Sequence, residues 1–133
     1  MANNYAIFDR AEKKRALSKF LDAIPLYIEA MRLSGNDREL KMSCSFALGD
    51  TYRMVGDFTK SAKCYRQAHR LSIAAGDGTM ATDAMVGLGL SLRATGSLKE
   101  ALKIFDESLK AYKALGDRAG VAFTLWSRAG ALR

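Results

Sequence analysis

Apolar and small residues recur along the chain at the spacing of one helix face. In the window 58–71 they are three or four positions apart, at Phe58, Ala62, Tyr65, Ala68 and Leu71. Such spacing is typical of an amphipathic α-helix that packs on one side. Other windows of the chain share this pattern, and none alternates apolar and polar residues as a strand does. The pattern therefore predicts an all-α protein.

Short turn signals separate the helical windows. Within helix pairs they are Gly56-Asp57 and Gly96-Ser97, where the glycine can end one helix and the next side chain can cap the following one. Between pairs they are Asn36-Asp37, Gly76-Asp77 and Gly116-Asp117. Turns this short make neighbouring helices antiparallel. They predict helices over residues 4–16, 20–33, 37–55, 58–75, 78–95, 98–115 and 118–132.

The pattern also repeats at a fixed period. Residues 48–71, LGDTYRMVGDFTKSAKCYRQAHRL, recur forty positions later at 88–111 as LGLSLRATGSLKEALKIFDESLKA. A period of this length marks a solenoid of stacked supersecondary units. The sequence predicts a single domain, 1–133, with units at about 4–36, 37–76 and 77–116 and part of a fourth at 117–133.

The repeated residues resemble the tetratricopeptide repeat (TPR) family. Its pattern is Trp-x2-Leu-Gly-x2-Tyr in the first helix, then a small residue, an aromatic residue and an alanine in the second. The second unit matches with Leu48-Gly49, Tyr52, Gly56, Phe58, Tyr65 and Ala68, and the third with Leu88-Gly89, Gly96, Leu98, Ala101 and Phe105. The spacing is forty residues, where thirty-four is common in the family. The resemblance implies a right-handed α-solenoid of antiparallel helix pairs, with about seven helices, that binds other proteins.

Small residues mark the places where the helices of a unit cross. Gly49 and Gly89 have no side chain, so a partner helix can approach closely there. Tyr27, Tyr65 and Phe105 are large enough to fill the space between successive units. We expect Gly49 and Gly89 to lie in equivalent surroundings, in units that are stable only when stacked.

Composition matters mainly for what it excludes. One histidine and two cysteines offer no catalytic triad and no zinc spacing, and the short motif Gly87-Leu88-Gly89 lacks the further glycine of a phosphate-binding loop. We therefore expect no enzyme, no metal and no cofactor. No apolar run is long enough to cross a membrane, and the first residues lack a secretory signal, which predicts a cytoplasmic protein.

In the family that this chain resembles, the first helix of each pair lines a concave groove. Register places on that face the residues expected to bind a peptide, which are Tyr5, Phe8, Glu12, Arg15, Phe46, Asp50, Arg53, Met54, Val86, Leu90, Arg93, Ser127 and Arg128. Arg15, Arg53 and Arg93 are equivalent in three units and would form a ladder beside an apolar floor. Guanidinium groups bind carboxylates with two hydrogen bonds. The sequence therefore predicts a scaffold or adaptor for a protein segment with acidic residues.

Three alternatives stay open at this level. Glu12 and Asp50 lie three residues before Arg15 and Arg53, so local ion pairs could neutralise the ladder. The net charge of +7 suits a nucleic acid, although few aromatic residues that could stack on bases accompany the arginines. Trp126 belongs to a final helix with no following partner, which suits a homo-oligomer formed through that helix.

Overall fold

The structure is a computed structural model that describes residues 4–132, and within that range it contains seven α-helices and no strand. The helices are α1 (Asn4–Ala16), α2 (Phe20–Arg32), α3 (Arg38–Met54), α4 (Phe58–Ala74), α5 (Gly78–Ala94), α6 (Leu98–Leu115) and α7 (Arg118–Ala131). Each predicted helix is present, and each end lies within one residue of its predicted position. The all-α prediction is confirmed. No helix in this range is long and apolar enough to cross a membrane.

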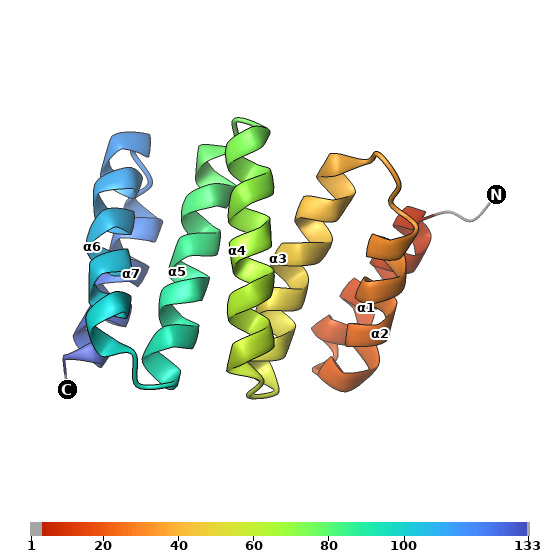
Figure 1. The fold of residues 1–133 in the computed structure, drawn as a ribbon, viewed down its shortest axis with the longest axis horizontal. Helices are drawn as coiled ribbons and strands as arrows, with labels where there is room; N and C mark the ends of the chain where they lie inside the picture. The colour runs from red at the N-terminus through yellow and green to blue at the C-terminus, as the bar shows by residue number, and fades with distance from the viewer. Residues whose placement is uncertain (1–3, 133) are drawn as a thin grey trace.

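The helices stand side by side in two layers (Figure 1). Each helix packs against its neighbours in sequence, and contacts also join α1 to α3, α3 to α5 and α5 to α7. Over the described residues, α2, α4 and α6 make no such contacts with one another. Because the odd-numbered helices are more closely spaced, the stack curves toward them. They form the inner, concave layer of the solenoid.

The turn chemistry agrees with most of the predicted signals. A carboxylate caps four helices by accepting the amide hydrogen three residues further on, and the capping residues are Asp37, Asp57, Asp77 and Asp117. The glycines in the turns have positive φ, and they are Gly35, Gly56, Gly76, Gly96 and Gly116. A side chain at these positions would be strained, which explains why glycine recurs there.

Two turn details differ from the prediction. Ser97 makes no side-chain capping bond, although Asp57 caps α4 at the equivalent position of the second pair. The left-handed residue before α3 is Gly35, at φ 56°, and not Asn36. In the turn between α1 and α2, which has no glycine, Ser18 takes φ 59°. This conformation costs a non-glycine residue about 1 kcal/mol.

A glycine packed against an aromatic ring forms the joint within the second and third units. A Cβ atom added at Gly49 would lie 2.7 Å from the Tyr65 ring, and one at Gly89 would lie 2.6 Å from the Phe105 ring. Both rings are fully buried. The expectation that the two glycines occupy equivalent surroundings is confirmed. Tyr65 also reaches the next unit, where a Cβ at Gly87 would lie 2.4 Å from its ring.

A third joint of this kind was not predicted. Tyr112 of α6 is buried and packs against Gly120 of α7, where an added Cβ would lie 2.5 Å from the ring. The ring lies seven positions after Phe105, so it falls outside the repeated pattern. It fixes α7 against α6.

Candidate functional site

Two adjoining hollows lie on the inner layer. The N-terminal hollow, of about 360 Å³, is lined by Glu12, Arg15, Ala16, Phe20, Asp50, Arg53 and Met54. The C-terminal hollow, of about 190 Å³, is lined by Phe46, Asp50, Arg53, Tyr65, Asp83, Val86, Gly87, Leu90, Tyr112 and Phe123. The two hollows share Asp50 and Arg53. They form one continuous depression over α1, α3, α5 and α7, and this depression is the candidate site.

The arginines of the predicted ladder all have partners inside the protein. Arg15 forms ion pairs with Glu12 at 3.2 Å and with Asp50 at 3.1 Å. Arg53 lies 3.9 Å from Asp50 and donates from Nε to the hydroxyl oxygen of Tyr65 at 3.2 Å. Local ion pairs are therefore present at two of the three positions. The side chains of Arg15, Asp50 and Arg53 remain about one quarter exposed and that of Glu12 is 38% exposed, so solvent reaches them.

Arg93, the third member of the ladder, is held differently. Its Nη1 donates to the backbone carbonyl of Ser127 at 2.8 Å, and Arg93 lines neither hollow. Ser127 is fully buried, and its hydroxyl donates to the carbonyl of Phe123. The Nε of Arg128 donates to Asp106 of α6 at 2.8 Å, which directs this arginine toward the outer layer. The structure thus brings Arg15 and Arg53 together at the hollows and leaves the other two arginines outside them.

Buried tyrosines hold the carboxylates of the inner layer in place. The hydroxyl of Tyr27 donates to Glu12, and that of Tyr65 donates to Asp50. Burial, followed by the neighbouring carboxylate, raises the pKa of each phenol, so both stay protonated as donors. The sequence pattern places these tyrosines in the joints, but nothing in it indicates their hydrogen bonds to carboxylates.

Among the carboxylates that line the hollows, Asp83 is the one with no cation beside it. It accepts a hydrogen bond from the hydroxyl of Tyr112 at 2.5 Å, and it forms no ion pair with residues 4–132. Burial raises its pKa most, the hydrogen bond from Tyr112 lowers it in part, and the negative charges of Asp117, Asp77 and Asp50 raise it further. The C-terminal hollow is therefore locally acidic in a protein of net charge +7.

The predicted apolar floor lies mostly below the accessible surface. Val86 and Leu90 are buried. The ring of Phe8 packs edge-on against Tyr27, with centroids 5.7 Å apart, and the ring of Phe46 packs edge-on against Tyr65, with centroids 5.9 Å apart. The apolar side chains that a partner can reach are Met54, at 51% exposure, and Phe123, at 48%. Phe123 was not predicted, although it occupies the inner-stripe position of Asp83 one repeat later. Tyr5, also on the predicted stripe, donates to Asp37 at 2.8 Å, away from both hollows.

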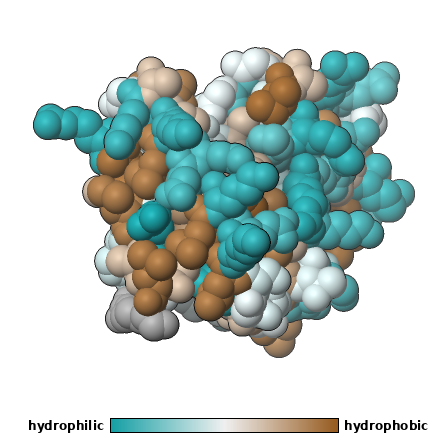
Figure 2. Space-filling model, turned by 60° about the vertical axis from the view of Figure 1, so that its left-hand side comes forward, coloured by the Kyte–Doolittle hydropathy of each residue, from teal (hydrophilic) through white to brown (hydrophobic). Residues whose placement is uncertain are grey.

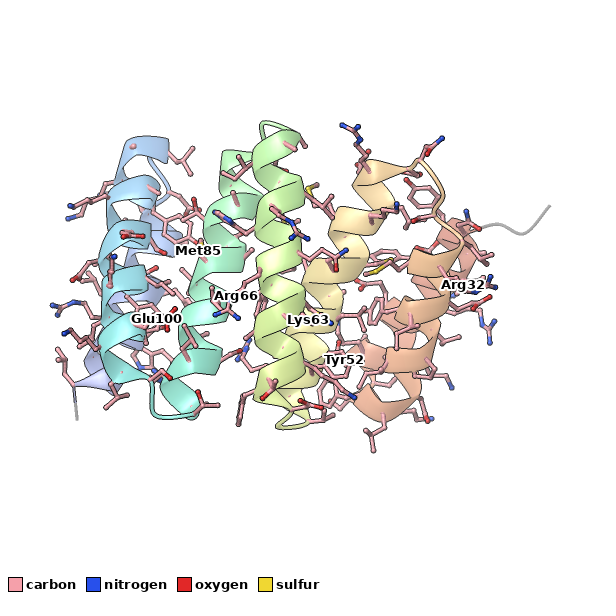
Figure 3. The ribbon with its side chains drawn as sticks, viewed as in Figure 1. Arg32, Tyr52, Lys63, Arg66, Met85 and Glu100 are labelled. Atoms are coloured by element: carbon pink, nitrogen blue, oxygen red, sulfur yellow. The ribbon has the colours of Figure 1, made fainter. Side chains whose placement is uncertain are left out.

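The most basic helix lies in the outer layer. Helix α4 carries Lys60, Lys63, Arg66 and Arg70 at helical spacing and contains no acidic residue. Figure 3 shows Lys63 and Arg66 on its outer side, with Glu100 of α6 across from Arg66 at 4.0 Å. The residues that line the hollows carry nearly equal numbers of positive and negative charges, so the groove does not share the net positive charge of the whole protein.

An apolar face is exposed on α7. Its large side chains are Phe123, Leu125 and Trp126, and Leu132 follows the helix, each about half exposed or more. The rings of Phe123 and Trp126 lie 6.1 Å apart. Figure 2 shows hydrophobic side chains gathered on one side of this end of the molecule and hydrophilic ones on the other. No other described helix covers this face.

The structure offers little for covalent or metal chemistry. Over residues 4–132, no group of three or more His, Cys, Asp or Glu side chains could hold a metal ion. Burial raises the pKa of the Cys44 thiol to about 12 and that of Cys64 to about 11. Both thiols are therefore protonated at neutral pH and are poor nucleophiles.

Comparison with known proteins gives a structural relative but no sequence family. No protein-family model matches the chain, and no curated protein sequence matches it significantly. The structure is similar to that of BtubC (BKLC) from P. vanneervenii, with a TM-score of 0.72 and 21% identity. The match covers 86% of this chain and 48% of that one, so this chain spans about half the length of BtubC.

A second match is a kinesin-light-chain structure from Podosopora anserina with nearly identical TPR-like repeats. It has a TM-score of 0.42 and 11% identity, over 99% of this chain and 97% of the other. At 21% identity, the similarity to BtubC concerns the fold alone. With the helix pairs and joints described above, that fold is a helical repeat of stacked antiparallel helix pairs.

Proposed function

We propose that this chain is a protein-interaction scaffold that holds a segment of a partner protein along its concave face. The observation that carries the proposal is the continuous depression made by the two hollows, which share Asp50 and Arg53. Concave surfaces of stacked helix pairs are the usual binding surfaces of such solenoids. The proposed role is binding without catalysis, and it requires no cofactor.

The partner segment would use two kinds of contact. Apolar side chains would pack on Met54 and Phe123, which are half exposed at opposite ends of the depression. Acidic side chains would bind Arg15 and Arg53 by replacing the ion-pair contacts that these arginines now make with Glu12 and Asp50. Because one carboxylate replaces another, the exchange gives modest affinity and favours a well-placed acidic residue over a random one.

Affinity capture with surface variants tests the proposal. Met54→Glu and Phe123→Glu change exposed side chains, so they should leave the fold intact and reduce capture of the partner by about tenfold or more. Leu21→Glu is the matched control, since Leu21 is 73% exposed on α2 of the outer layer. Capture of the same proteins at the same level by native protein and both inner variants would contradict binding on the concave face.

A second candidate function is self-association through α7. It is favoured by Trp126, which is 61% exposed beside Phe123 and Leu125. Pairing of this face in a two-fold dimer would cover these side chains in both copies. Light scattering over a hundredfold range of concentration should then show a dimer that Trp126→Lys converts to a monomer. A native monomer throughout the range would exclude this candidate.

A further inference from the structure

We propose that the C-terminal hollow contains a subsite for a positively charged side chain, lysine or arginine, of the partner segment, with Asp83 as its counter-ion. This inference rests on the proposed function and specifies the chemistry of the segment at one place in the groove. It differs from the expectation of an acidic partner, because it assigns a basic residue to the third unit.

The first support is the uneven distribution of ion pairs between the two carboxylates of this hollow. Asp50 lies 3.1 Å from Arg15 and 3.9 Å from Arg53, so two guanidinium groups neutralise it. Asp83 has no cation among the described residues within ion-pair distance. A cation that enters the hollow therefore finds one carboxylate that is not already engaged by arginine.

The second support is the environment of Asp83. The carboxylate is partly buried, and the nearby charges that act on it come from Asp117, Asp77 and Asp50. Burial without a counter-charge disfavours the ionised form, and like charges add to this cost. The hydrogen bond from Tyr112 offsets these penalties only in part, because the pKa of Asp83 remains raised. A bound ammonium or guanidinium group would reduce both penalties, so the ionised carboxylate is more stable when a cation occupies the site.

The third support is geometric. Tyr112 donates to Oδ1 of Asp83, which fixes the carboxylate and leaves Oδ2 without a hydrogen bond from residues 4–132. The same hollow is lined by Phe46 and by the half-exposed ring of Phe123. A carboxylate oxygen beside aromatic rings suits a cationic side chain, which can form a charged hydrogen bond and contact a ring face. One carboxylate and a phenol are too few ligands for Ca²⁺ or Mg²⁺.

The subsite belongs to one unit of the solenoid. The positions equivalent to Asp83 are Ser43 in the second unit and Phe123 in the fourth. The depression therefore has an arginine-containing end, at Arg15, and an acidic end, at Asp83. A segment with an acidic and a basic residue in the matching order would bind in one direction only.

NMR titration with single-residue probes tests the subsite. The probes are the N-acetyl amides of arginine and lysine, with the N-acetyl amide of norleucine as the uncharged control. We expect the charged probes to shift amide signals of α5 and α7 around the hollow and to bind about tenfold more tightly than norleucine. They should also lower the pKa of Asp83, followed by its side-chain carbon signal.

The test variant is Asp83→Asn, which keeps an oxygen to accept from Tyr112 and removes the charge. It should lose the preference for the charged probes. Asp9→Asn removes the same charge from an exposed position on α1 and should keep the preference. Equal binding of norleucine and lysine amides to native protein, or unchanged binding by Asp83→Asn, would overturn the subsite.

The outcome is separable from that of the proposed function. If the inner variants Met54→Glu and Phe123→Glu lose the partner while the cationic probes fail to bind, the groove stands and the subsite is wrong. If the probes bind in the hollow while capture is insensitive to both inner variants, the hollow accepts cations but does not hold the partner segment, so the inference and the proposed function both fail.

Discussion

The second and third units share one backbone geometry and differ in the polar chemistry built on it. In both, a glycine of the inner helix packs against a buried ring of the outer helix, at Gly49–Tyr65 and Gly89–Phe105. In the second unit the ring carries a hydroxyl that donates to Asp50. In the third, Phe105 has no hydroxyl, and the position equivalent to Asp50 is Leu90. The third unit thus lacks both the hydroxyl donor and the carboxylate acceptor of this hydrogen bond.

Different residues therefore hold the units together and provide the polar groups that a partner can bind. A buried carboxylate without its donor would be costly, whereas replacing both partners by apolar groups can be nearly neutral. The third unit makes its own bond two turns earlier on the inner helix, from Tyr112 to Asp83. The glycine–aromatic joint determines how the two helices of a unit pack. The tyrosine–aspartate pair determines the charge of the groove at that unit.

The largest expected effect comes from filling a joint. Gly89→Leu would place a side chain where even a Cβ lies 2.6 Å from the Phe105 ring, and should lower the free energy of unfolding by about 1–3 kcal/mol. Gly78→Ala is the control, because its Cβ would lie 3.6 Å from Leu115, an ordinary contact. Urea unfolding measures both. Equal midpoints for native protein and Gly89→Leu would mean that the joint is not tightly packed.

A transplant of the polar pair tests whether the two joints are equivalent. Phe105→Tyr alone and Leu90→Asp alone each leave a buried polar group without its partner, and should each cost about 1–3 kcal/mol. The double variant should cost less than the sum, because the new hydroxyl can donate to the new carboxylate. A double-mutant cycle measures this coupling. Strictly additive costs would show that the third unit does not align its helices as the second does.

The helix caps offer a smaller contrast between the units. Asp57→Ala removes a carboxylate that accepts the Lys60 amide at 3.1 Å, and should cost about 1 kcal/mol. Ser97 occupies the equivalent place in the third unit but makes no capping bond, so Ser97→Ala should cost less. Thermal unfolding of the two variants compares them. A larger loss from Ser97→Ala would contradict the assigned cap geometry.

The smallest effect is on the pH dependence of stability. The folded pKa of Asp83 is raised, so its contribution to stability falls as pH rises above about 4, the ordinary value for an aspartate. The pKa of Asp37 is lowered, first by the Leu40 amide and then by the Tyr5 hydroxyl, so its contribution is lost as pH falls below that value. Because asparagine resembles the protonated carboxyl, Asp83→Asn and Asp37→Asn should both depart from native protein above about pH 4 in unfolding titrations, with Asp83→Asn more stable and Asp37→Asn less stable than native protein. Departures of the same sign would contradict the assigned shifts.

The fold was predictable because its signals are local and repeated. Left-handed glycines, capping aspartates and helical spacing fix the helix ends, and the forty-residue period brings Gly89 to the place of Gly49. Ser97 departed from prediction because a cap bond depends on side-chain and backbone angles that residue type does not determine.

The site was less predictable because its chemistry depends on how helices cross. The pair of Glu12 with Arg15 follows from spacing along one helix. The pair of Arg15 with Asp50 and the bond from Tyr112 to Asp83 join residues about thirty positions apart on different helices. Phe123 and Asp83 occupy equivalent positions one repeat apart, but their importance depends on which arginines already have partners.

Hydrogen–deuterium exchange of the protein with a captured partner segment tests the central claim most directly. The account predicts slower exchange in α1, α3, α5 and α7, greatest beside the two hollows, with little change in the outer layer. Protection concentrated in α2, α4 and α6, including the basic face of α4, would contradict binding on the concave side.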